Sequence, residues 1–70
     1  MLRKHSITIR GHQTSFSIED EFWDELRAIS QKTDIPVSRL VTQIDTSRLQ
    51  TTNLSSAIRL YVLRELRHKD

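Results

Sequence analysis

The feature that most constrains the fold is a change of period within residues 13–29. In Gln13–Ile18, Phe16 and Ile18 alternate with serines, which is the period of two that a strand with one buried face requires. The following apolar residues fall at helical spacing, namely at Ile18, Phe22, Leu26 and Ile29. A strand that runs directly into a helix leaves its hydrogen-bonding edge exposed. We therefore expect a partner strand, and the rest of the chain can be interpreted as building a homodimer that supplies it.

The residues before this strand leave two interpretations open. Ile7 and Ile9 alternate with polar residues, and Gly11 follows at a position typical of a two-residue hairpin turn over 11–12. That turn would set Ile7 opposite Phe16 and Thr8 opposite Ser15. The apolar side chains would then share one face, and the other face would carry Lys4, Ser6, Thr8, Arg10, Gln13, Ser15 and Ser17. Residues 1–12 are thus either the first strand of a hairpin or a frayed basic arm.

The periodicity and the breaking residues predict one mainly α-helical domain over 1–70 with a short N-terminal β ribbon. Ser17 is the expected N-cap of the first helix, Pro36 suits the first turn of the second, and Asn53 is a good N-cap for the third. Apolar residues on more than one side of the third helix predict contacts on more than one side, which makes it a second candidate interface. The predicted ranges are 13–18 for the ribbon strand and 18–33, 36–45 and 53–67 for the helices.

Size and composition restrict the class of protein. With 70 residues and no cysteine, the chain buries little surface alone, so oligomerisation is the expected stabiliser. The three scattered histidines match no structural zinc spacing, and we expect neither a metal nor a cofactor. No apolar run reaches membrane-spanning length and the N-terminus lacks the apolar core of a signal peptide, which predicts a soluble, cytoplasmic protein with no membrane partner.

The residues give little indication of catalysis. No serine or threonine has a histidine at plausible helical or strand spacing, and helix capping explains the carboxylates, so we do not expect an enzyme.

The first sixteen residues contain no acid, although the formal net charge is only +2. A basic arm of this kind can contact nucleic acid, but charge alone favours ordinary solvated side chains.

The order of strand, helix, short break and second helix resembles the ribbon-helix-helix proteins. The residues that carry the resemblance are 14–19 for the ribbon, 22–26 for the first helix and 35–41 for the start of the second. The tail 53–59 resembles a small bacterial subfamily with an extra helical segment. The resemblance implies a homodimeric DNA-binding transcriptional regulator whose two ribbon strands pair antiparallel and enter the major groove. A hairpin in each copy would instead give a four-stranded sheet, which is too broad for the groove.

The resemblance also implies site residues, which are assigned by their positions in the matching segments. The outward ribbon residues, expected to contact bases, are Gln13, Ser15 and Ser17. Phosphate contacts are expected from the basic arm and the start of the second helix, through Lys4, Arg10, Val37, Ser38 and Arg39. The expected dimer core is Phe16, Ile18, Phe22, Leu26, Leu40, Ile44, Ile58 and Val62. The alternative is a dimeric, antitoxin-like protein-interaction module that binds a partner through the third helix and has lost specific DNA recognition.

Overall fold

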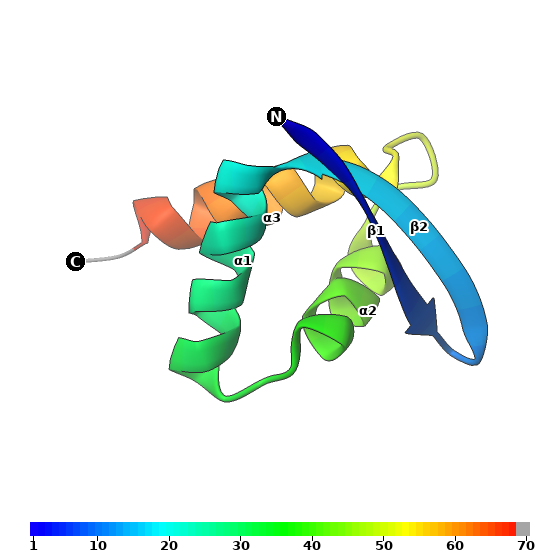
Figure 1. Ribbon diagram of the computed structural model, residues 1–70, viewed down its shortest axis with the longest axis horizontal. Helices are drawn as coiled ribbons and strands as arrows, with labels where there is room; N and C mark the ends of the chain where they lie inside the picture. The colour runs from blue at the N-terminus through cyan, green and yellow to red at the C-terminus, as the bar shows by residue number, and fades with distance from the viewer. Residues whose placement is uncertain (69–70) are drawn as a thin grey trace.

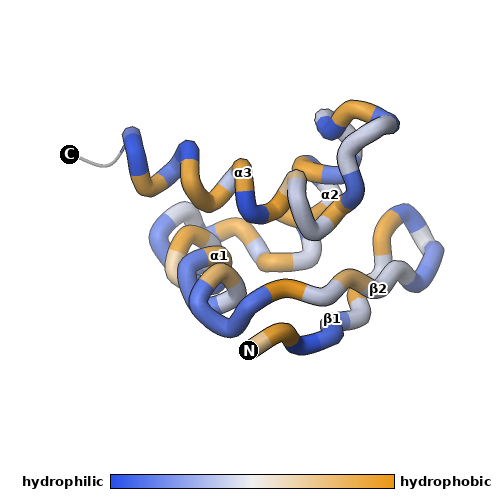
Figure 2. Tube along the Cα trace, turned by 90° about the horizontal axis from the view of Figure 1, so that it is seen from above, coloured by the Kyte–Doolittle hydropathy of each residue, from blue (hydrophilic) through white to orange (hydrophobic). Residues whose placement is uncertain are grey.

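A two-stranded β ribbon followed by three helices makes up the chain. The structure is a computed structural model that describes residues 1–68. The elements are β1 (Leu2–Ile9), β2 (His12–Glu19), α1 (Asp20–Thr33), α2 (Val37–Ser47) and α3 (Leu54–Arg67) (Figure 1). The three helices contact one side of the hairpin (Figure 2). The predicted class, a mainly helical chain with an N-terminal β ribbon and a third helix, is confirmed.

The partner strand of β2 comes from the same chain. β1 pairs with β2 antiparallel, so the hairpin is the correct one of the two interpretations of residues 1–12, and a second copy is not needed to supply the partner strand. The turn is formed by Arg10 and Gly11, whose φ angles of 51° and 80° are both positive, as a type I′ turn requires. The predicted register was wrong by two residues, since Ile7 lies opposite Thr14. A slip of two leaves every side chain on its predicted face, because the strand period is two.

The junction between β2 and α1 differs from the predicted cap. Ser17 lies within β2, and Glu19 occupies the N-cap position of α1 without a side-chain capping hydrogen bond. Instead, the Glu19 carboxylate accepts two hydrogen bonds from Arg59 of α3, at 2.8 and 3.1 Å. The first-turn acids Asp20 and Glu21 complement the positive end of the helix dipole. Asn53 caps α3 as expected, accepting from the Ser56 backbone N–H at 2.8 Å.

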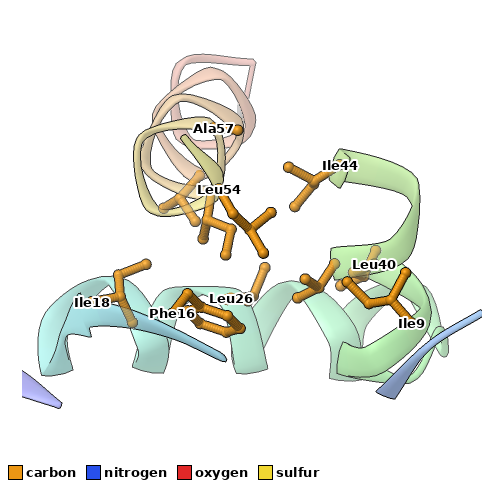
Figure 3. Close-up of a cluster of buried hydrophobic side chains, with 11 residues drawn as sticks. Ile9, Phe16, Ile18, Leu26, Leu40, Ile44, Leu54 and Ala57 are labelled. Atoms are coloured by element: carbon orange, nitrogen blue, oxygen red, sulfur yellow. The ribbon is translucent and has the colours of Figure 1, made fainter. Parts of the chain in front are cut away.

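One hydrophobic core joins the hairpin to all three helices. Side chains from the inner face of the hairpin and from α1, α2 and α3 point to a common centre (Figure 3). Of the eight residues predicted for the dimer core, seven are buried within this single chain and Phe22 is partly buried. Full burial of each such side chain contributes about 1.5–3 kcal/mol. One chain therefore forms a core without help from a second copy.

Candidate nucleic-acid interface

The face of the hairpin that turns away from the helices is a continuous polar surface. Six exposed side chains alternate with buried or partly buried ones along the two strands, and we call them the polar face: Lys4, Ser6, Thr8, Gln13, Ser15 and Ser17. The register sets Lys4 beside Ser17 and Ser6 beside Ser15. Strands of eight residues give the ribbon a length of about 26 Å. The ribbon thus presents paired polar side chains from Thr8 and Gln13 to Lys4 and Ser17, beyond which the exposed Leu2 lies opposite Glu19.

The inner face fixes this arrangement, since Ile9, Phe16 and Ile18 are buried in the core. A strand alternates its side chains between its two faces, so burial of these residues forces their neighbours outward. Gln13, Ser15 and Ser17 accordingly lie where the sequence places them. Ser6 and Thr8 were assigned to the right face but were not predicted as base contacts, because the residue pattern left their strand unresolved.

An aromatic cluster holds β1 against α1. The His5 ring stacks on Trp23, with ring centroids 3.8 Å apart and planes inclined by 15°. Phe16 of β2 lies beside both rings, at centroid distances of 5.8 and 6.3 Å. The His5 Nε2 atom is buried without a hydrogen-bond partner among residues 1–68, so packing rather than hydrogen bonding holds this side chain. The cluster packs Trp23 against the core and fixes the hairpin on the helices.

Two of the arginines around the hairpin are engaged in contacts within the chain. Arg3 forms an ion pair with Asp20 at 2.9 Å between Nε and Oδ1. Arg10 donates from its guanidinium to the Thr46 hydroxyl near the end of α2. Lys4 differs from these arginines, because no carboxylate of residues 1–68 lies within 4 Å of its ammonium. Lys4 is therefore the cation that the polar face itself offers to an anion.

The start of α2 is a second place where an anion could bind. The backbone N–H groups of Val37 and Ser38 donate to no acceptor within the described part of the chain, and Arg39 is exposed beside them. Pro36, the N-cap residue, has no N–H to add. The helical rise separates Ser38 from Thr46 by about 12 Å, so the structure does not bring this end of α2 together with Arg10. Because Lys4 lies about 20 Å along the hairpin from Arg10, the predicted phosphate contacts form three groups.

The far end of β2 is tied to α3. The Ser55 hydroxyl donates to the Ser17 backbone carbonyl at 2.7 Å. The hydrogen bonds from Arg59 hold the pKa of the Glu19 carboxyl below its ordinary value of 4.5, and the charge of Arg59 adds to this effect. Glu19 is therefore ionised at neutral pH. The hydrogen bond from Ser55 uses only the backbone of Ser17, so the Ser17 side chain stays exposed on the polar face.

Among residues 1–68, no group of three or more histidine, cysteine, aspartate or glutamate residues could hold a metal ion. Over the same residues, no helix combines the length and the apolar character needed to cross a membrane.

Comparison with known proteins gives one finding. The sequence model of a family described as the ribbon-helix-helix domain matches residues 2–66. The match includes both strands and nearly all of α3. Neither the curated proteins nor the solved structures gave a match.

Proposed function

Because the chain belongs to the ribbon-helix-helix domain family, we propose that it is a transcriptional regulator that binds double-stranded DNA through its hairpin. The observation that supports this most is the polar face, carried by a two-stranded ribbon. The major groove admits a two-stranded ribbon, and side chains on its outer face can reach base edges. The proposed activity is binding, and no residue is assigned a catalytic role.

The side chains of the polar face have distinct proposed roles. The Gln13 amide both donates and accepts, so it can pair bidentately with adenine, while Ser15 and Ser17 can bond to several base edges. Ser6 and Thr8 add hydroxyls beside them from β1. Lys4, Arg10 and the start of α2, through Val37, Ser38 and Arg39, would contact phosphates and set the orientation of the ribbon.

A homodimer is part of the proposal, since the family usually acts on DNA as dimers. Its contact has to leave both polar faces open. Alternation of the antiparallel ladder turns the backbone N–H and C=O groups of Lys4, Ser6 and Thr8 away from β2, and such an edge can accept another strand. Pairing of two β1 edges would give a four-stranded sheet too broad for the groove. We therefore propose a dimer in which the β1 edges stay unpaired.

The direct test is affinity for a labelled duplex of arbitrary sequence, measured by fluorescence anisotropy across a salt series. Contacts to phosphate release counterions, so log K should fall linearly with log salt concentration. Sedimentation of the same sample should give twice the 8.3 kDa mass of the chain. A protein that does not bind duplex DNA at low salt would refute the proposal. A folded monomer at micromolar concentration would refute its dimeric part alone.

The second candidate is a protein-interaction module that kept the fold without specific DNA recognition. Its support is the composition of the polar face, which has four hydroxyls and one glutamine but a single cation, Lys4. The salt series separates the two candidates, because an interaction module should show no appreciable duplex affinity.

A further inference from the structure

The outer side of α3 carries an exposed leucine stripe. Its inner side buries Leu54, Ala57, Ile58 and Val62 in the core. Leu60, Leu63 and Leu66 follow at intervals of three, and these side chains are 44%, 47% and 42% exposed. Successive steps of three keep residues on neighbouring parts of one helix surface. Half-exposed leucines grouped in this way indicate a contact surface, whereas singly scattered ones would not.

A hollow of about 170 Å³ adjoins the stripe at Leu60. It lies between the end of α2, the following loop and α3, and its lining includes Leu49, Leu60 and Tyr61. Leu49 is 72% exposed, which leaves apolar surface open on the loop side. The volume suits one large apolar side chain, so the hollow could seat an anchor residue of a partner.

The charge beside Leu60 and Leu63 is positive, whereas Glu25 and Glu65 lie with Leu66 around a separate hollow between α1 and α3. Arg64 and Arg67 are exposed in the last two turns of α3, and no carboxylate of residues 1–68 lies within 4 Å of either. Arg59, one turn earlier, is in contrast neutralised by Glu19 at 2.8 Å. Arg64 also lines the hollow. The surface thus combines an apolar stripe, an anchor hollow and two uncompensated positive charges.

We propose that this surface of α3 binds an amphipathic helix of a partner protein, whose apolar stripe is flanked by acidic residues. An apolar helix face fits the stripe and inserts one side chain into the hollow, as helices bound in grooves do. Acidic residues beside it meet Arg64 and Arg67, which adds orientation and specificity.

A second copy fits less well. An antiparallel pair of α3 helices centred on Leu63 would set Arg67 opposite Arg59 of the other copy, so Arg67 would gain no acidic partner. The acidic side of α1, with Glu21, Asp24 and Glu25, offers only Ala28 as an apolar contact. An external acidic helix satisfies both the leucines and the arginines.

The leucine stripe lies away from the polar face, and only the hollow approaches a proposed DNA contact, since Arg48 lines both this hollow and a second one that Arg10 lines. The C-terminal half of α3 extends past α1, at the end of the molecule away from the hairpin turn (Figure 1). Partner binding therefore need not displace DNA from the polar face, and each activity can be lost without the other.

The test is a selection from a displayed library of helix-forming peptides against the full chain. Enriched peptides should carry an apolar stripe flanked by aspartate or glutamate. Leu63→Glu, at an exposed position, should weaken binding of the best peptide at least tenfold while the melting temperature stays unchanged. Arg64→Glu with Arg67→Glu should weaken it similarly, and the matched charge reversal Lys4→Glu on the polar face should leave it unchanged.

Several outcomes would overturn the proposal. One is enrichment of no peptide, or of peptides without acidic residues. Another is a dimer that Leu63→Glu converts to a monomer, which would make the stripe a contact between copies. A third is binding to phosphatidylserine vesicles that Leu63→Glu abolishes while no peptide binds, which would assign the stripe to a lipid surface. Because none of these readouts involves DNA, failure here is distinguishable from failure of the proposed function.

Discussion

The two faces of the hairpin differ in what their side chains contact. On the inner face, Ile9, Phe16 and Ile18 are buried against three helices. On the polar face, every second residue is exposed, and Ser17 contributes only its backbone carbonyl, which accepts a hydrogen bond from the Ser55 hydroxyl. The same two strands thus specify the fold with one face and leave the other open. Substitutions on the two faces should therefore separate stability from binding, and the following predictions test that separation.

The largest effect is expected from deletion of residues 1–10, which removes β1 entirely. The edge of β2 would lose its backbone partner, and the core would lose Ile9 and the stacking of His5 on Trp23. The truncated chain should lose cooperative thermal unfolding, as followed by circular dichroism. If it unfolds at the temperature of the full chain, β2 has another partner strand, and the intramolecular hairpin is wrong.

Adjacent residues on opposite faces should differ sharply in stability. Phe16→Ala removes a buried aromatic ring and should cost about 3–5 kcal/mol in the free energy of unfolding. Ser15→Ala is the matched control and should change stability by no more than about 0.5 kcal/mol, since its side chain is exposed. Urea unfolding of both variants measures the two values. Equal losses would mean that the faces are not divided as described.

Replacement of the cation on the polar face should affect DNA affinity alone. Lys4→Ala should lower affinity similarly for all duplex sequences and reduce the salt slope by about 0.9, the value for one phosphate contact. Arg64→Ala on α3 serves as the control and should leave the slope unchanged. A Lys4→Ala variant with altered sequence preference would show that Lys4 contacts bases.

The smallest effect concerns the ion pair that ties β2 to α3. Because the pKa of Glu19 is lowered in the folded chain, its stabilising contribution is present above pH 4.5 and is lost as the pH falls through the lowered value. Glu19→Gln should therefore be slightly less stable than the unchanged chain at pH 7, and the difference should vanish in acid. The control Glu25→Gln, at an exposed residue of α1, should show no such loss. A difference between Glu19→Gln and the unchanged chain that is independent of pH would contradict this role of the Arg59 contact.

The residue pattern was sufficient for the helices and for the sorting of the hairpin faces. Burial of Phe16, Leu26 and Ile58 follows directly from their period, because strand and helix periods each place one face inward. Asn53 likewise predicts the start of α3, since its side chain accepts a hydrogen bond from a backbone N–H of that helix.

The turn and the partner strand could not be read from the pattern. A single glycine fits two adjacent turns, and the actual turn uses Arg10 at a positive φ, where a non-glycine residue is uncommon. Tertiary contacts offset that cost, since Arg10 bonds to Thr46 and His5 stacks on Trp23. These contacts join residues far apart in sequence, so no local spacing reports them. Ser6 and Thr8 entered the candidate site only once β1 was established.

The most direct test of the central claim is a selection on random duplex DNA with the unchanged chain and with Gln13→Ala. The unchanged chain should enrich one site. Gln13→Ala, folded and equally stable, should lose about 1–3 kcal/mol of discrimination at one symmetric pair of positions, because a bidentate contact to a base is lost. Ser15→Ala should lose less, since one hydroxyl suits several bases. If the unchanged chain enriches no site, or if Gln13→Ala selects the same site with the same stringency, the polar face does not read DNA.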